Sequence, residues 1–314
     1  MNLKETLLSI LKFFLPYRIG YSLFQSYVDI QMINSYIKKV DTNCRHLANI
    51  VTKKEYHLDG SGEISKKPLN LHELSIFSQN GEDGILLYIF SIIGTTSKTF
   101  IEFGVEDGKE CNTANLSINH NWKGLLIDGS DKNVTEGLKF YASCCGDKKQ
   151  NVIFAKHFVT AENINGIFLE NGFYGEIDLL SIDLDGNDYY IWKAIDTVRP
   201  RVVVIEYNAS FGVDRKATID YDPNFVWNST SYPELFYTGA SLSLLERLAT
   251  EKGYYLIGCD SCGINAFFVR EDVGKNKLAK VTVKEAFYPH ANRTVRFGLD
   301  GQEQAVRQLK LRDL

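Results

Sequence analysis

Seven short apolar runs, separated by segments with helical patterning, constrain the fold of this chain most strongly. The runs are strand candidates at 99–103, 124–127, 152–155, 177–182, 201–206, 254–258 and 266–269. Most are apolar throughout, as expected of strands in a sheet that is covered on both faces. Helix candidates lie between them, at 83–93, 133–142, 189–194 and 241–252. The alternation predicts a doubly wound α/β fold with a mostly parallel, Rossmann-like sheet.

The last two strand candidates are joined by the short segment 259–265, which predicts a C-terminal hairpin and hence one antiparallel strand. This segment contains Cys259 and Cys262 in a CxxC pattern, but no second cysteine pair follows at zinc-ribbon spacing. We therefore expect a turn here rather than a metal or redox site. Six cysteines in 314 residues predict reduced thiols and a cytoplasmic protein.

Four regions are predicted along the chain: a helical arm at 1–54, a polar linker at 55–70, a cofactor-binding domain at 71–275 and a C-terminal extension at 276–314. The arm carries an apolar series with alternating steps of three and four residues: Ile30, Ile33, Ile37, Val40, Cys44, Leu47 and Val51. Such a seam either pairs with the arm of another subunit or packs on the main domain. We favour pairing, which predicts a homodimer.

The first 16 residues are apolar, but they are too few to span a bilayer and are interrupted by Lys4, Glu5 and Lys12. The sequence thus predicts no transmembrane segment. Packing on the protein's own body and peripheral contact with a membrane surface both stay open. A net charge of -4 and a pI of about 5.9, without a clustered basic face, predict no nucleic-acid partner.

The first strand candidate ends in the loop 102–108 (EFGVEDG), where glycines allow sharp turns and close approach to a ligand. In open α/β sheets the ligand lies beyond the carboxyl ends of the strands, so this loop is a predicted cofactor site. Its acidic residues, including Glu102 and Glu106, would repel a pyrophosphate but attract a sulfonium and an amino group. We therefore predict S-adenosylmethionine rather than NAD, contacted by Glu102, Gly104 and Glu106.

Further cofactor contacts are predicted at neighbouring strand ends. Asp128 ends the second strand 24 positions after Gly104, near the spacing of about 20 expected for a carboxylate that binds ribose hydroxyls, and Gly129 follows it. After the third strand, the segment 156–162, with His157 and Ala161, is placed to flank the adenine. Before the first strand, Gln79, Glu82 and Asp83 begin a helix. They form either a lid over the cofactor or an acidic first turn.

An acidic group follows the fourth and fifth strands. Asp183 and Asp185 alternate in sequence, which predicts that both point to one face, and Glu206 and Asn208 end the adjacent strand. Two mechanisms are compatible with these residues. Asp183, Asp185 and Glu206 could hold Mg²⁺, which would activate a substrate hydroxyl. Alternatively, Asp183 or His157 acts as a general base without metal, with Asp185 orienting the acceptor.

A long polar and aromatic segment, 208–240, follows the fifth strand. Loops of this length are uncommon without a function, and aromatic side chains mixed with polar ones suit a sugar or another polyhydroxyl acceptor. The alternative is a loop that its own aromatic side chains pack down. The predicted substrate-binding residues are Tyr207, Asn208, Arg215, Trp227 and Tyr237.

Six motifs, in this order along the chain, resemble the FkbM-like S-adenosylmethionine-dependent methyltransferases, and most closely the group associated with bacterial capsule and lipopolysaccharide gene clusters. The motifs are SQNGEDGIL, FIEFGVEDG, LLIDGS, LLSIDLDGNDYYIW, VVVIEYN and GINAFFVR. The resemblance covers about 77–270 and implies a class I methyltransferase fold with a seven-stranded sheet and methyl transfer to an oxygen. It implies that Glu102, Gly104 and Asp128 contact the cofactor and that Asp183 lies at the transfer site.

The predicted function is S-adenosylmethionine-dependent O-methyl transfer to a sugar or another small precursor of a bacterial surface glycan. The segment SIDLDGND also resembles a strand end of metal-dependent sugar O-methyltransferases, but their paired aspartates on the next strand are replaced by Glu206 and Asn208. Two alternatives stay open. The acceptor could be a phosphoryl-bearing small molecule, with Lys156, Arg215 and Lys216 lining the pocket, or the protein could be a non-catalytic Rossmann-like binding or scaffold protein.

Overall fold

A computed structural model describes residues 17–64, 67–145 and 151–314. The chain divides into two compact units, Met1–Val51 and Thr52–Leu314. The first unit consists, in its described part, of most of helix α2 (Tyr17–Glu55). The expectations for residues 1–16, including contact with a membrane surface, lie outside the described residues. Within the described part, no helix combines the length and the apolar character needed to cross a bilayer.

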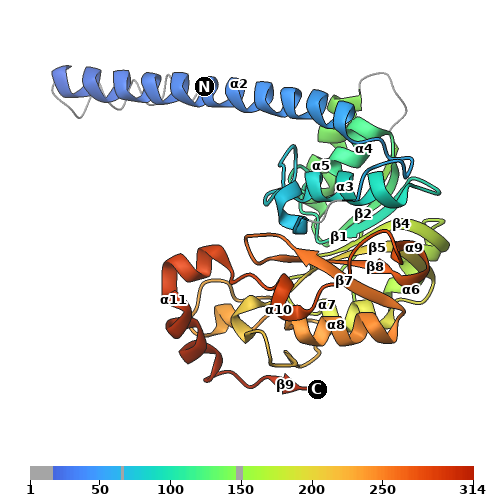
Figure 1. Ribbon diagram of the computed structural model, residues 1–314. Coiled ribbons are helices and arrows are strands. Elements are labelled where there is room, and N and C mark those ends of the chain that lie inside the picture. The colour runs from blue at the N-terminus through green and yellow to red at the C-terminus, as the bar shows by residue number, and fades with distance from the viewer. Residues whose placement is uncertain (1–16, 65–66, 146–150) are drawn as a thin grey trace. The chain divides into compact units, whose positions relative to one another are not determined.

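The second unit is built on a sheet of seven strands (Figure 1). They are β1 (Thr99–Phe103), β2 (Lys123–Asp128), β3 (Val152–Lys156), β4 (Gly175–Ile182), β5 (Val198–Glu206), β7 (Tyr254–Cys259) and β8 (Asn265–Arg270). Their order is β3-β2-β1-β4-β5-β8-β7, and β8 runs antiparallel to both of its neighbours. This is the strand order of the Rossmann-like class I methyltransferase fold, so the predicted fold class, with its C-terminal hairpin, is confirmed.

Helices cover both faces of the sheet (Figure 1). One face carries α3 (Glu82–Ile93), α4 (Ala114–His120) and α5 (Asp131–Cys145), whose apolar residues share a core with Phe100, Leu126 and Val204. The other face carries α6 (Ile164–Glu170), α7 (Asp188–Ala194), α8 (Leu242–Glu251) and α10 (Val283–Ala286). Because strand side chains alternate between the faces, the almost entirely apolar strands supply both cores.

The segment after β8 folds onto the 208–240 segment. It contains α9 (Glu271–Gly274), α11 (Ala291–Val306) and β9 (Arg312–Asp313), which pairs with β6 (Ala217–Thr218). A small third core joins Ala305 and Val306 to Phe211, Leu235 and Phe236, near the short helices η2 (Ala209–Phe211) and η3 (Glu234–Phe236). The aromatic loop is therefore packed by its own side chains together with the C-terminal segment. Another short helix, η1 (Leu69–His72), precedes α3.

The CxxC segment is a turn, as predicted. The Asp260 carboxylate accepts hydrogen bonds from the backbone N–H groups of Cys262, Ile264 and Asn265. Within the described residues Cys259 and Cys262 are free thiols, and neither belongs to a group of potential metal ligands.

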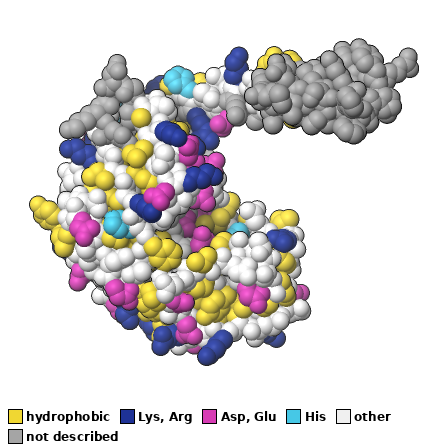
Figure 2. Space-filling view, turned by 180° about the vertical axis from the view of Figure 1, so that it is seen from behind, with side chains coloured by type: hydrophobic (Ala, Val, Ile, Leu, Met, Phe, Trp, Pro, Cys, Tyr) yellow, Lys and Arg dark blue, Asp and Glu magenta, His cyan; other side chains and the backbone are white. Residues whose placement is uncertain are grey.

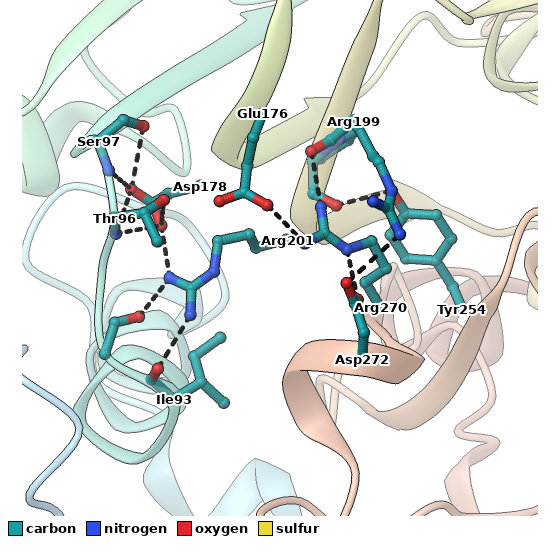
Figure 3. A network of polar contacts seen from close by, with 12 residues as sticks. Ile93, Thr96, Ser97, Glu176, Asp178, Arg199, Arg201, Tyr254, Arg270 and Asp272 are labelled. Atoms are coloured by element: carbon teal, nitrogen blue, oxygen red, sulfur yellow. Dashed lines mark hydrogen bonds and ion pairs between the residues drawn. The ribbon is translucent and has the colours of Figure 1, made fainter.

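A buried ion pair fastens the amino-terminal edge of the sheet to α3 (Figure 3). The Arg201 guanidinium donates to Asp178 Oδ1 at 2.7 Å and to the backbone carbonyls of Gly94 at 2.7 Å and Ile93 at 3.0 Å. Asp178 also accepts hydrogen bonds from the backbone N–H groups at 96–98. One pair thus joins β4, β5, the end of α3 and the start of β1.

Replacing Arg201 with methionine leaves the Asp178 carboxylate buried without its cation. We expect the free energy of unfolding in urea to fall by about 3–5 kcal/mol, the usual cost of breaking a buried pair. Arg199→Met is the matched control. Arg199 lies on the same strand as Arg201, but its ion pair with Asp272 is exposed. That pair should contribute at most about 1 kcal/mol to the free energy of unfolding. Equal losses for the two variants would contradict this role of Arg201.

Candidate functional site

Gly104 brings the end of β1 against the end of β4. It has φ +76°, and a Cβ atom at this position would lie 1.5 Å from the Asp183 carbonyl oxygen. Its N–H also donates to the Ile127 carbonyl on β2 at 3.0 Å. Only glycine fits both the backbone conformation and the contact. The predicted cofactor loop therefore lies between the carboxyl ends of β2 and β4.

Glu102 organises the continuation of this loop. Its buried carboxylate accepts hydrogen bonds from the backbone N–H groups of Asn112 (2.9 Å) and Thr113 (3.0 Å). The hydroxyl groups of Thr113 (2.6 Å) and Ser181 (3.0 Å) also donate to it. Burial raises the pKa of Glu102. The residue borders the site, but these bonds make it a brace of the 104–113 loop.

Two adjoining cavities open at this edge of the sheet. The larger, of about 370 Å³, is the acidic cavity, lined by Gln79, Asn80, Glu82, Glu102, Gly104, Val105, Glu106, Asp107, Lys109, Glu110, Cys111, Asn112, Asp183, Asp185, Ile264 and Asn265. The smaller, of about 210 Å³, is the Asp128 cavity; it includes Gly129, His157, Phe158 and Phe225 and shares Gly104, Glu106, Asp183 and Asp185 with the first. Figure 2 shows a hollow on one face of the molecule, with acidic side chains inside it.

Most of the predicted cofactor residues meet at these cavities. Gln79, Glu82, Glu102, Gly104, Glu106 and Asp183 line the acidic cavity, whereas Asp128 and Gly129 line the other. Asp128 Oδ1 accepts hydrogen bonds from the Ser130 N–H and the Asn133 amide, and in the described part of the chain no group donates to its Oδ2. His157 lies with Asp128 rather than with Glu206 and Asn265.

Two predicted cofactor residues do not line either cavity. Asp83 accepts hydrogen bonds from the backbone N–H groups of Ile76, Phe77 and Ser78, so it anchors the loop before α3 from beneath. Burial raises the pKa of Asp83 to about 6. The backbone N–H of Ala161 donates to the Tyr221 hydroxyl. The structure therefore assigns both residues to internal contacts.

The five predicted substrate-binding residues also lie outside the two cavities, because each has partners within the protein. The Tyr207 hydroxyl donates to the Tyr288 carbonyl, and the Asn208 amide donates to the Phe236 and Thr238 carbonyls. Arg215 pairs with Asp313, Trp227 donates to the Leu235 carbonyl, and the Tyr237 hydroxyl accepts from the Asp220 N–H. Packing and hydrogen bonding explain these side chains without a substrate.

The acidic group forms as predicted, but by a different local geometry. Carboxylate oxygens of Asp183, Asp185 and Glu206 all lie within 4.8 Å of one another. Asp183 directly follows β4, whose Ile182 pairs with Ile205, so its neighbour across the sheet is Glu206. Asp185 has φ +53° and belongs to a turn; strand alternation is therefore not what places it beside Asp183. We call these three residues the carboxylate cluster.

Burial and mutual repulsion favour the protonated forms of the carboxylate cluster. Burial, together with the charges of Asp188 and Glu106, raises the pKa of Asp185 to about 6. Burial and neighbouring carboxylates raise the pKa values of Asp183 and Glu206 as well. A divalent cation prefers such oxygen ligands, at about 2.0–2.6 Å, and would displace these protons. The three residues therefore fit a magnesium site, the same set that the sequence predicted.

Arg293 balances part of this negative charge, and sequence analysis did not find it. It lies on α11, is almost fully buried and donates to Asn208 Oδ1 at 3.0 Å. Its charge lowers the pKa values of Asp185 and Glu206, although burial raises them more. No motif covers 276–314, so only the folding of this segment onto the sheet revealed the residue.

Asn265 was also missed, although it lies in the motif GINAFFVR. It begins β8, pairs across the sheet with Glu206 and is almost fully buried. Its Nδ2 donates to Glu82 Oε1 at 2.8 Å, whereas its Oδ1 has no hydrogen-bond partner. Asn265 lines the acidic cavity, and a buried carbonyl oxygen without a partner is uncommon enough to require an explanation.

No protein-family model matches the chain, and no curated protein matches it. Solved structures with a similar arrangement include an O-methyltransferase from Bacillus cereus with SAH, at 15% identity, covering 64% of this chain and 82% of that chain, with a TM-score of 0.39. The N-terminal domain of EvdMO1 with SAH has 14% identity, covers 66% and 80%, and has a TM-score of 0.37. With identities and TM-scores this low, functional assignment rests on the residues of this chain.

The carboxylate cluster predicts pH-dependent metal binding. Protons compete with a cation for these groups, so we expect the Mn²⁺ affinity measured by calorimetry to fall from pH 8 to pH 6, by up to about tenfold per unit for each proton displaced. The stability of the metal-free protein depends on pH in the opposite direction. Because the carboxyl pKa values are raised in the folded state, these groups stabilise the fold at low pH, and this contribution is lost as pH rises.

Asp185→Asn should abolish this Mn²⁺ binding, whereas Glu110→Gln, a charge-matched change elsewhere in the acidic cavity, should retain it. Equal binding at pH 6 and pH 8, or persistent binding in Asp185→Asn, would rule out this metal site.

Proposed function

We propose that this protein is an S-adenosylmethionine-dependent O-methyltransferase acting on a sugar or another small precursor of a bacterial surface glycan. One observation carries the proposal: the Gly104 loop, Asp128 and Asp183 lie around two adjoining cavities at the carboxyl edge of the sheet. Ligands of open α/β sheets bind at this edge. The glycan precursor is inferred from the sequence resemblance.

The order of the strands supports one orientation of the cofactor. Asp128 ends β2 and Asp183 follows β4, and β1 lies between these strands. The two residues are thus separated by two strand spacings, about 10 Å. We place the ribose at the free Oδ2 of Asp128, with the adenine beside Phe158. The sulfonium then lies near Asp183, where the acidic surroundings stabilise its positive charge.

Methyl transfer needs an acceptor oxygen aligned with the C–S bond of the sulfonium. Bound S-adenosylmethionine would supply the methyl group: a C–O bond to the acceptor would form as the C–S bond breaks, SAH would leave, and the hydroxyl proton would pass to a base of this chain. Asp183 is the base we propose, because it lines both cavities and so lies between the proposed cofactor and acceptor positions, whereas His157 lines only the Asp128 cavity on the ribose side. The surrounding protein supplies alignment and excludes water.

Magnesium fits this scheme as an additional component. Asp183, Asp185 and Glu206 would hold it, and a bound cation would lower the pKa of the acceptor hydroxyl. Asp183 would then serve as a ligand, and proton release would be assisted by the lowered pKa. The charge of Arg293 acts on Asp185 and Glu206 and offsets part of the carboxylate charge in either case.

A phosphoryl-bearing acceptor is less well supported than a neutral or cationic one. The acidic cavity has seven carboxylate side chains and one lysine, Lys109, which pairs with Asp107. Of the three cations expected for a phosphate, Lys156 and Arg215 pair with Asp131 and Asp313, and Lys216 lines neither cavity. Since an anion would be repelled, we favour the sugar acceptor.

The proposed location is the cytoplasm.

Calorimetry with S-adenosylmethionine tests the cofactor assignment. Asp128→Asn replaces a charge-assisted hydrogen bond to ribose with a neutral one, so its Kd should rise about tenfold or more, the range expected for a bond to a charged group. Asp131→Asn, an exposed neighbour that pairs with Lys156, should leave the affinity unchanged.

Binding of NAD without binding of S-adenosylmethionine would contradict the proposed methyltransferase function. Binding of S-adenosylmethionine without SAH formation from any tested acceptor would favour the binding or scaffold alternative.

A further inference from the structure

We propose that Glu82 and Asn265 form a subsite for a protonated amino group of the acceptor. This inference rests on the proposed methyltransferase function and narrows the acceptor to amine-bearing compounds such as amino sugars. Asn265 is 4% exposed and lines the acidic cavity, and its buried Oδ1 has no hydrogen-bond partner among the described residues. Because the amide nitrogen donates to the Glu82 carboxylate, the orientation of the amide is defined and its oxygen must accept.

Glu82 supplies the charge of this subsite. It is 1% exposed, and its hydrogen-bond donors among the described residues are neutral groups: the Asn80 N–H, the Asn80 amide and the Asn265 amide. Within the described residues no Lys or Arg lies within ion-pair distance of it. A buried carboxylate without a cation is costly, and a bound ammonium group would offset that cost.

The position of the subsite assigns it to the acceptor. Asn265 begins β8, which lies two strands beyond β4 on the side away from β2. With the ribose at Asp128 and the sulfonium near Asp183, Asn265 lies about 10 Å past the transferred methyl group. The cofactor spans β2 to β4, so the ligand group at Asn265 belongs to the second substrate. An ammonium group can donate to the Glu82 carboxylate and to the Asn265 side-chain oxygen, whereas Glu82 would repel a phosphate.

Matched sugars test this subsite in the SAH-saturated protein. Calorimetry with D-glucosamine, D-glucose and N-acetylglucosamine compares an ammonium with a hydroxyl and a neutral amide at the same carbon. We expect glucosamine to bind at least tenfold more tightly than the other two. Glu82→Gln, which keeps the shape and removes the charge, should abolish this preference, and Asn265→Leu should weaken it. Glu110→Gln, at the rim of the same cavity, is the control that should retain it.

Equal affinities for the three sugars, undetectable binding of all three, or an unchanged preference in Glu82→Gln would overturn the amine subsite. The binding of S-adenosylmethionine is measured separately in each variant. If the wild-type protein does not bind S-adenosylmethionine, the proposed function is overturned instead. A failure of the amine subsite and a failure of the proposed function therefore give different results.

A second inference comes independently from α2. The structure assigns its apolar seam to pairing with the same helix of a second copy, in parallel and in register. Five seam residues are 54–61% exposed, and Cys44 is exposed too; the five are Ile30, Ile33, Val40, Leu47 and Val51. Strict alternation of three- and four-residue steps is the spacing that another helix of the same kind complements in a left-handed coiled coil.

The types of residue in the seam support a parallel pair. At the positions equivalent to Ile30, those spaced by seven, the chain has Ile37, Cys44 and Val51. β-Branched residues at this heptad position favour two parallel strands where leucine holds the other seam position. Leu47 provides this combination next to Val51, while Ile33 and Val40 hold the other two positions. In such a pair each seam residue meets its own copy, so Cys44 faces Cys44 of the second copy. An antiparallel pair would place Cys44 opposite an apolar residue instead.

Light scattering and oxidative cross-linking test this pairing on the full chain. We expect a dimer that mild oxidation links through Cys44, and no link in Cys44→Ser. Val40→Asp combined with Leu47→Asp should give a monomer, whereas His46→Asp, an exposed change outside the seam, should leave the dimer intact. A monomeric wild-type protein, or a dimer that survives the double substitution, would overturn the pairing. A dimer without the Cys44 link would overturn its parallel register.

Discussion

The contact between Gly104 and the Asp183 carbonyl is the constraint on which the arrangement of the site depends. It draws the loop after β1 against the end of β4, at a separation that leaves no room for a Cβ atom. The same loop is hydrogen-bonded to β2 through Ile127 and braced by Glu102. Both cavities adjoin this crossing, so the proposed cofactor and acceptor positions meet where the backbone is packed most tightly.

Charge is distributed unevenly around this crossing. The carboxylate cluster and Glu82 are gathered at the edge where β4 and β5 end and β8 begins, and Arg293 is a buried cation whose charge acts on the cluster. At the opposite edge, the Asp178 carboxylate is matched by Arg201. The balanced pair stabilises the fold, whereas the unbalanced carboxylates favour positively charged ligands: the sulfonium, a divalent cation and an ammonium group.

The predicted sheet agrees with the structure strand by strand because apolar runs bounded by polar residues are a local property of the sequence. The carboxylate cluster was predictable for a related reason: residues that end adjacent parallel strands must lie close together. The predicted substrate-binding residues, in contrast, do not line the cavities. Arg215 and Trp227 have the right chemistry, but their partners Asp313 and Leu235 are set by the folding of the loop and the C-terminal segment, which no sequence period reveals.

The sequence by itself determined the α/β architecture, the glycine loop, Asp128 and the membership of the carboxylate cluster, since each follows from patterns within or directly after a strand. Only the tertiary structure decided that Asp83 braces a loop, that the charge of Arg293 acts on the carboxylate cluster, and that Asn265 lines a cavity and has a buried oxygen to which no described residue donates. These roles depend on contacts between residues as far apart as Asn208 and Arg293, or Glu82 and Asn265. Such contacts depend on how helices and loops pack on the sheet. This packing produces no periodic pattern in the local sequence from which it could be predicted.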